Sequence, residues 1–311
     1  MKNTRIIQKA GLFTLLALLW LSSACSGQPA ATPSTELPAF EEFTQGTGKI
    51  AFAAQVNEDV MFDLYFISAD TGKQYQITQN LNADIAPDFS RDGMRMVFSS
   101  DRLKTYDLFT INLPSGSPVL LLENSTDETE PRFSPDGTRI AYQADSYGDN
   151  DIFVVLSNGG KHVRLTEEDS QDTQPAWSPD GEQLAFVSDR DGDFEIFLMN
   201  AEGSGLKQVT SNTNYEAAPV WSPDGTQLAY ISNRGSHFQL YQIELATGAE
   251  KQLTDFSGTV HSLAWSPDGM FIAYILDYSE GSQVNAYEIA SGTSYRVTGG
   301  FYKYAGLTWS Q

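Results

Sequence analysis

Carboxylates are the groups in this chain best suited to chemistry, because they crowd the segments between its apolar stretches. The 311 residues include 40 Asp and Glu against 19 Lys and Arg. Acids just before recurring apolar stretches are the candidate partner-binding residues: Asp84, Asp127, Glu128, Asp172 and Glu216. Gathered around one opening, they would form a negative funnel for a basic peptide or a divalent cation. The alternative is that they are solvated loop residues that keep the protein in solution.

Three arginines also recur at a fixed spacing. Arg102, Arg190 and Arg234 are separated by multiples of 44 residues, so in a repeating fold they would project alike. A guanidinium pairs with a carboxylate through two parallel hydrogen bonds, so the three could clamp a carboxylate of a partner. The alternative is that they pair with acids of neighbouring loops.

Motifs for catalysis or metal binding are lacking. The chain has no Gly-x-Ser-x-Gly elbow, His-Glu-x-x-His pair or phosphate loop, and its three histidines fall at different phases of the 44-residue spacing. The Asp-Arg-Asp-Gly-Asp run at 189–193 superficially resembles a calcium loop. It has Phe194 and Asn200 where an EF-hand needs Gly and Glu, which favours a hairpin. We expect no catalytic residue, metal or cofactor, with acid-only catalysis and calcium left as alternatives.

The first 24 residues have the pattern of a signal peptide. Lys2, Arg5 and Lys9 precede an apolar run at 10–21, which is too short for the ~20 residues of a membrane-spanning helix. The run ends in Leu-Ser-Ser-Ala before Cys25, the only cysteine. This resembles the lipobox of bacterial lipoproteins, whose cysteine is lipidated. An ordinary secretory signal cut nearby is the alternative.

Charge restricts the partners of the mature chain. Removal of residues 1–24 leaves 16 basic and 40 acidic residues, a net charge of −24, which repels nucleic acids and anionic lipid headgroups. The segment 25–47 is rich in Pro, Thr, Ser and Ala and is expected to be a flexible tether. We therefore expect contact with a membrane through the lipid anchor only.

The remaining sequence, 48–311, repeats every 44 residues. Phe89-Ser-Arg-Asp-Gly returns as Phe133-Ser-Pro-Asp-Gly, and then three times with Trp177, Trp221 and Trp265 in first place. One further step reaches Trp309-Ser310, where the sequence ends. Five equal steps indicate a repeat architecture. The tryptophans are expected to pack between repeats rather than to form a platform for sugar rings.

Each repeat is predicted to form four short strands. Ser-Pro-Asp-Gly suits a type I turn, alternating segments such as 183–187 and 195–199 follow, and the fourth strand ends in Leu-Thr or Val-Thr. The first repeat starts at its second strand near Ile50, and the last ends after a first strand at Trp309. The two partial repeats together make one, which predicts an all-β, six-bladed β-propeller. Its C-terminal strand completes the first four-stranded blade.

This pattern is similar to that of a known family. The aromatic-Ser-Pro-Asp-Gly-x-x-Ile/Leu-Ala-Phe/Tyr repeat, followed by Ser-Asp-Arg at 188–190, resembles the TolB-like propeller repeat, also called the WD40-like PD40 repeat. In bacterial TolB the propeller follows an α/β domain and contributes to a cell-envelope complex with a peptidoglycan-associated lipoprotein. Here only a signal and a tether precede the propeller, so we expect a TolB-like lipoprotein without that domain.

These observations predict a non-catalytic lipoprotein of the bacterial cell envelope, facing the periplasm or the exterior. We expect a monomer that binds an envelope protein or peptide at the mouth of its channel. A propeller lyase or hydrolase acting on polysaccharide or peptide, and a calcium-dependent carbohydrate-binding module, are the alternatives.

Replacement of Cys25 by serine tests the anchor. Without the thiol no acyl chain can be attached, so Cys25→Ser should lose palmitate labelling and leave the membrane fraction. Fractionation of labelled cells measures both. A variant that stays membrane-bound with unchanged labelling would contradict the prediction.

Overall fold

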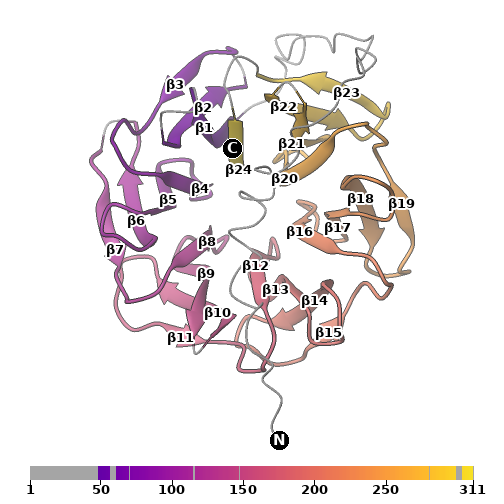
Figure 1. The fold of residues 1–311 in the computed structure, drawn as a ribbon, viewed down its shortest axis with the longest axis horizontal. Helices are drawn as coiled ribbons and strands as arrows, with labels where there is room; N and C mark the ends of the chain where they lie inside the picture. The colour runs from indigo at the N-terminus through magenta and orange to yellow at the C-terminus, as the bar shows by residue number, and fades with distance from the viewer. Residues whose placement is uncertain are drawn as a thin grey trace, which may run out of the picture.

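A computed structural model describes residues 48–56, 61–69, 71–114, 116–146, 148–279, 281–298 and 303–310. The predicted signal at 1–24 and tether at 25–47, with Cys25, lie outside these residues. Six four-stranded antiparallel sheets stand around a central axis (Figure 1). The predicted six-bladed propeller is therefore confirmed. No helix in the described part of the chain has the length and apolarity to cross a lipid bilayer.

The chain builds blades 2 to 6 one after another, each from its inner to its outer strand, while blade 1 receives its inner strand last. Blade 1 is β24 (Lys303–Ser310), β1 (Lys49–Gln55), β2 (Asp63–Ser68) and β3 (Gln74–Gln76); blade 2 is β4 (Asp84–Phe89), β5 (Arg95–Ser100), β6 (Asp107–Asn112) and β7 (Val119–Leu122); blade 3 is β8 (Glu128–Phe133), β9 (Arg139–Ser146), β10 (Asp149–Leu156) and β11 (Val163–Arg164). Blade 4 is β12 (Asp172–Trp177), β13 (Gln183–Ser188), β14 (Glu195–Asn200) and β15 (Lys207–Gln208); blade 5 is β16 (Glu216–Trp221), β17 (Gln227–Ser232), β18 (Gln239–Glu244) and β19 (Glu250–Gln252); blade 6 is β20 (Thr259–Trp265), β21 (Phe271–Tyr278), β22 (Gly281–Glu288) and β23 (Thr293–Arg296).

The Ser-Pro-Asp-Gly segments form the predicted turns between first and second strands. In blade 4 the Gly181 amide donates to the Ser178 carbonyl at 2.9 Å, which is the bond that closes a four-residue turn. The Ser178 hydroxyl donates to Asp180 at 2.6 Å, and Asp180 accepts the amide of Glu182 at 3.0 Å. The same serine–aspartate bond occurs in the turns of blades 2, 3, 5 and 6.

The C-terminal strand closes the ring. β24 pairs antiparallel with β1, from Lys49 opposite Ser310 to Gln55 opposite Lys303, and supplies the inner strand of blade 1. This is the closure expected from the two partial repeats. It leaves β1 paired on both sides instead of exposing an unpaired inner edge.

Every inner strand contains a bulge at the same place. One residue in each has a left-handed backbone, with φ between 49° and 56°, and the pairing with the second strand shifts there. These residues are 44 apart: Ala86, Glu130, Gln174, Ala218, Ser262 and Gly306. A side chain on Gly306 would meet the backbone of the next inner strand, since its Cβ would lie 2.8 Å from the Ala86 Cα. Glycine is therefore needed where the last inner strand approaches the first.

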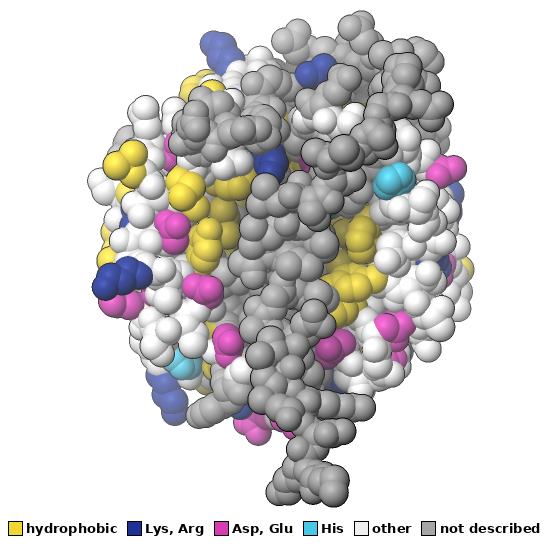
Figure 2. Space-filling model, viewed as in Figure 1, with side chains coloured by type: hydrophobic (Ala, Val, Ile, Leu, Met, Phe, Trp, Pro, Cys, Tyr) yellow, Lys and Arg dark blue, Asp and Glu magenta, His cyan; other side chains and the backbone are white. Residues whose placement is uncertain are grey.

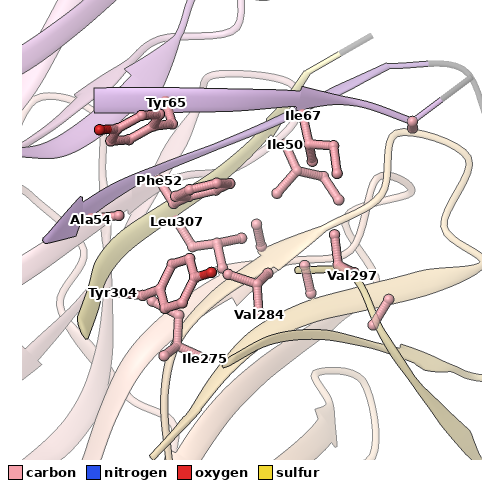
Figure 3. Packing of buried hydrophobic residues seen from close by; sticks show 14 of the residues in the cluster. Ile50, Phe52, Ala54, Tyr65, Ile67, Ile275, Val284, Val297, Tyr304 and Leu307 are labelled. Atoms are coloured by element: carbon pink, nitrogen blue, oxygen red, sulfur yellow. The ribbon is translucent and has the colours of Figure 1, made fainter. Parts of the chain in front are cut away.

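The hydrophobic core lies in the seams between blades. Figure 3 shows one seam, where Ile50, Phe52 and Leu307 of blade 1 pack with Ile275 and Val284 of blade 6. The repeated tryptophans contribute to these seams, as predicted. The Trp177 indole nitrogen donates to the Arg132 carbonyl of blade 3 at 3.1 Å, and the Trp221 indole nitrogen donates to the Ala176 carbonyl of blade 4 at 3.1 Å. Trp309 of blade 1 stacks on Phe271 of blade 6, and Trp265 of blade 6 packs among residues of blade 5.

Replacement of Gly306 by alanine should destabilise the ring where it closes. The added Cβ would collide with backbone atoms of β4, which costs about 1–3 kcal/mol. Gly235→Ala is the control, because no atom lies within 4 Å of its Cβ position. Urea unfolding of both variants measures the effect, and equal stabilities would contradict this account of closure.

Candidate binding site at one mouth of the channel

The Ser-Asp-Arg motif forms a clasp at the start of the inner strand, made by the three residues that end or follow the second strand. In blade 4 the Arg190 Nη2 donates to both oxygens of Asp172 at 3.0 Å, and its Nε donates to the Ser188 hydroxyl at 2.9 Å. Asp189 accepts the amide of Gln171 at 2.8 Å. The motif therefore fastens the loop entering the inner strand to the end of the second strand.

The clasp recurs in blades 2 and 5. Arg102 Nη2 donates to Asp84 at 2.8 and 2.9 Å, and Arg234 lies 3.4 Å from Glu216. Each of the three arginines also lies over an aromatic ring, as Arg102 does at 4.7 Å from the centre of Phe109. A guanidinium held by a carboxylate and a ring is not free to bind a partner.

Four of the five predicted acids are buried strand residues rather than loop residues. They stand at the starts of inner strands and have no exposed surface: Asp84, Glu128, Asp172 and Glu216. Asp127 alone is exposed, and it accepts the amide of Tyr106 at 2.8 Å. On the face shown in Figure 2, acidic side chains are spaced around the ring rather than gathered into one patch. Arg102, Arg190 and Arg234 thus pair with this chain's own acids, which was the alternative interpretation.

A second set of buried acids begins the third strands and faces the next blade. Asp151, on the third strand of blade 3, belongs to this set, and its carboxylate is close enough to Asp172 of blade 4 for the two like charges to repel. Burial raises the pKa of Asp151 to about 6, despite the ion pair of 2.6 Å with Arg164. The Thr166 hydroxyl donates to Asp151 at 3.2 Å and accepts the Ile152 amide at 3.0 Å, which explains the threonine just after the fourth strand.

A cavity of about 330 Å³ opens where the inner strands end. We call it the turn mouth, because the turns after the inner strands surround it. Its wall consists of four prolines, one from each turn of blades 3 to 6, together with Arg91 at the matching place in blade 2 and residues from the inner-strand ends: Pro135, Pro179, Pro223, Pro267, Arg91, Asp88, Phe89, Ser90, Phe133, Ser134, Thr308, Trp309 and Ser310. Rigid prolines offer an apolar surface that loses little entropy when it is covered.

Asp88 is the one carboxylate in the wall of this cavity among the described residues, and it joins three blades. It lies on β4 and accepts the Phe133 amide of blade 3 at 2.8 Å and the Thr308 hydroxyl of blade 1 at 2.8 Å. Loss of hydration raises the pKa of Asp88, while the nearby Arg132 lowers it. Both carboxylate oxygens of Asp88 accept hydrogen bonds from neighbouring blades, so Asp88 stabilises the wall of the mouth.

An outer ring of carboxylates surrounds the prolines. The aspartates of the five turns are exposed: Asp92, Asp136, Asp180, Asp224 and Asp268. Hydrogen bonds from the turn serine and from a backbone amide lower the pKa of the first four, to about 2 for Asp136. These groups keep their negative charge well below neutral pH, so the turn mouth has an apolar centre and an acidic rim.

The histidines do not form a shared centre. His261 pairs with Asp277 at 3.2 Å within blade 6, and His162 lies edge-on to Phe153 in blade 3. In the described part of the chain, no group of three or more His, Cys, Asp or Glu is arranged to hold a metal ion. The run at 189–193 contributes to the clasp of blade 4 instead.

The turn mouth was not predicted from the sequence, although its signal was present. The prolines recur every 44 residues directly after the inner strand, and they were interpreted only as turn formers. Inner-strand ends necessarily surround the channel of a propeller. The aromatic-Ser-Pro-Asp-Gly pattern therefore marked the opening as well as the turn.

Comparisons with known proteins agree with the repeat and the fold. Residues 121–311 match the PD40 family, described as the TolB beta propeller domain. No curated protein gives a significant match to the chain.

Solved structures share the fold at low sequence identity. TolB from Acinetobacter baumannii superposes with a TM-score of 0.76 at 19% identity, over 85% of this chain and 66% of that protein. A protein assigned as TolB from Agrobacterium tumefaciens gives 0.67 at 20% identity, over 81% and 88%. A puromycin-hydrolysing peptidase from Mycobacterium tuberculosis gives 0.59 at 15% identity, over 78% and 42%. The proteins that share this architecture therefore include at least one enzyme.

Removal of one clasp arginine should be costly. Arg190→Met would leave Asp172 buried without its cation, which destabilises a protein by about 3–5 kcal/mol. Blade 6 has Val260 and Tyr278 at the two matching positions, so the double variant Asp172→Val with Arg190→Tyr should recover much of that loss. Urea unfolding measures both, and a neutral Arg190→Met would contradict the role of the clasp.

Proposed function

Because the chain belongs to the PD40 family of TolB β-propeller domains, we propose that it is a non-catalytic binding scaffold of the bacterial cell envelope. In this proposal it binds a protein or peptide segment at the turn mouth. The observation that carries this proposal is the cavity of about 330 Å³ at the ends of the inner strands, with its wall of prolines and aromatic residues. At the opposite end of these strands the clasps already use the arginines and most of the candidate acids.

The ligand that fits this mouth has an apolar tip and basic flanks. The proline and aromatic side chains of the wall favour an apolar segment, because covering them removes apolar surface from water. The five exposed turn aspartates around them favour lysine or arginine on either side. Arg91 stands in the turn of blade 2 where the other turns have proline, and it gives the rim one place for a carboxylate.

The chemistry of the wall supports binding rather than hydrolysis. Acid–base catalysis by carboxylates usually needs two of them near one substrate, whereas Asp88 lines the cavity without a second described acid. Both oxygens of Asp88 accept hydrogen bonds from the protein itself. The other carboxylates with raised pKa, including Asp151, lie buried in the seams between blades.

The N-terminal pattern and the charge support the proposed location and partners. Lipidation of Cys25 would hold the propeller at a membrane, facing the periplasm or the exterior. A mature charge of −24 suits a basic envelope protein or peptide and opposes nucleic acids. We propose that the protein acts as a monomer, with its single channel mouth as the binding site.

Crosslinking from residues at the two ends of the inner strands tests which end of the channel binds the partner. A photoreactive benzoylphenylalanine in place of Pro223 should give polypeptide adducts in intact cells, because this side chain faces the turn mouth. The same group in place of Glu168, an exposed residue in the loop before β12, is the control and should give none. Adducts only at position 168 would contradict the proposal.

Charge removal at the rim tests the ligand chemistry. The triple variant Asp136→Asn, Asp180→Asn and Asp224→Asn keeps a hydrogen-bond acceptor for each turn serine. It should lower the affinity for the captured partner roughly tenfold, given about 0.2–1 kcal/mol for each exposed ion pair. The same charge change at Glu167, Glu168 and Asp169 should leave affinity unchanged. Fluorescence anisotropy with the crosslinked segment, made as a peptide, measures both at low and high salt.

A further inference from the structure

One buried acid differs from its counterparts in the other blades. The inner strands of blades 2 to 5 begin with Asp or Glu, and an arginine follows 18 residues later in three of them. After Glu128 of blade 3 that position holds Ser146. Blade 6 lacks both charges, with Val260 and Tyr278 at the two places. Glu128 is therefore the inner-strand acid of blades 2 to 5 that has lost its arginine.

The backbone explains why no clasp forms there. In blade 4 the second strand ends at Ser188 and the third begins at Glu195, so the segment between them folds back over the acid. In blade 3 the strands continue into an extended hairpin, with Asp149 paired opposite Ser146. That segment cannot return to the start of β8. The hairpin sequence from residue 140 to 156 contains no Lys or Arg that could replace the missing guanidinium.

Glu128 meets a second carboxylate across the seam between blades 2 and 3. Asp107 begins β6 of blade 2, and the Glu128 amide donates to the carbonyl of the preceding Tyr106 at 2.6 Å. Neither Glu128 nor Asp107 has exposed surface. Both oxygens of Glu128 and the Oδ1 of Asp107 have no hydrogen-bond partner within the described residues.

The groups around this pair do not supply a positive charge. Its titratable neighbours are Glu123 and Asp127, in the loop before β8, and Tyr142 on β9. Glu128 is repelled by the negative charges of Asp107 and Asp127. Asp107 is repelled by those of Glu123 and Asp127. Asn124, in the same loop, favours the charged forms of both acids but does not complete a bond to Glu128. Of the ion pairs within 4.0 Å in the described part of the chain, none includes Glu128 or Asp107.

The geometry points to a proton in place of the missing arginine: Asp107 and Glu128 hold one proton between them at neutral pH, which makes the seam between blades 2 and 3 a pH-sensitive joint. Two buried carboxylates that repel each other across a seam, with no cation beside them, resist being charged together. With one proton the pair carries a single charge. Loss of that proton leaves two like charges in the seam and loosens it.

The direction of the pH dependence follows from burial. Burial raises the pKa of Glu128 from 4.5 to about 7 and also raises the pKa of Asp107. A raised pKa in the folded state means that folding favours the protonated form. The stability from this proton is fully present below the unfolded pKa and is lost as the pH rises through about 7.

The test compares the full chain with Glu128→Gln, which keeps the shape of the protonated side chain and cannot ionise. Glu195 also has a pKa raised to about 7, so the difference between the two proteins is the readout rather than the wild-type curve. We expect the two unfolding constants to be similar at pH 5.5. At pH 8.5 that of the wild type should exceed that of Glu128→Gln on the order of tenfold to a hundredfold.

The matched control is Asp84→Asn, at the same position in blade 2. There Arg102 already supplies the cation, so removal of the charge should destabilise the protein at pH 8.5, the opposite sign to Glu128→Gln. Asp107→Asn repeats the test if Glu128→Gln does not fold. Hydrogen exchange of the Glu128 amide at pH 8.5 should be faster in the wild type than in the glutamine variant, which places the effect at the seam.

Two outcomes would overturn the proposal. One is a constant stability difference between wild type and Glu128→Gln from pH 5.5 to 8.5. The other is stabilisation of the wild type by calcium chloride at pH 8.5 that Glu128→Gln abolishes, since the pair would then hold a metal ion rather than a proton.

Discussion

Each blade buries its apolar face against the next blade, and the whole structure depends on these seams. Val154 of blade 3 shares one hydrophobic cluster with Trp177 and Phe186 of blade 4, and Phe52 of blade 1 shares another with Ile275 of blade 6. A single four-stranded sheet has no partner for its faces and would leave them in water. The ring solves this because its last seam covers the first blade. Polar residues at the seams must therefore be paired or neutral, and most of the chemistry described above follows from that requirement.

The two ends of the inner strands handle charge differently. At their starts, acids such as Asp172 are buried in the seams and are neutralised by clasp arginines or by protons. At their ends, the turn aspartates stay exposed and charged around a mouth of prolines. Buried carboxylates hold the blades together, and exposed ones remain available to a ligand. A count of acidic residues along the chain does not separate the two groups.

The sequence was sufficient for the fold because its signals are local and repeated. Five steps of 44 residues, the last of which reaches Trp309-Ser310, predicted six blades and their closure, and Ser-Pro-Asp-Gly predicted the turns. The site was harder, because residue type does not reveal burial. Asp84 looked like a loop acid and is a buried strand residue, since Arg102 covers it. The spacing of 18 residues between acid and arginine was visible in three repeats and would have identified the pairing. Pro179 and its equivalents surround an opening only once the ring is closed, which no single repeat can show.

The inner strand of blade 1 is β24, the last strand in the sequence, so blade 1 is the last blade that can be completed during synthesis. β1 and β24 are the chain's most distant partners, with Lys49 opposite Ser310, and a chain emerges from the ribosome with its N-terminus first. Until the eight residues of β24 arrive, β1 has an unpaired edge and the faces of blades 1 and 6 that will meet remain uncovered. Contacts this far apart in sequence are also the slowest to form. Synthesis therefore leaves a nearly complete ring that can close only after β24 has been made.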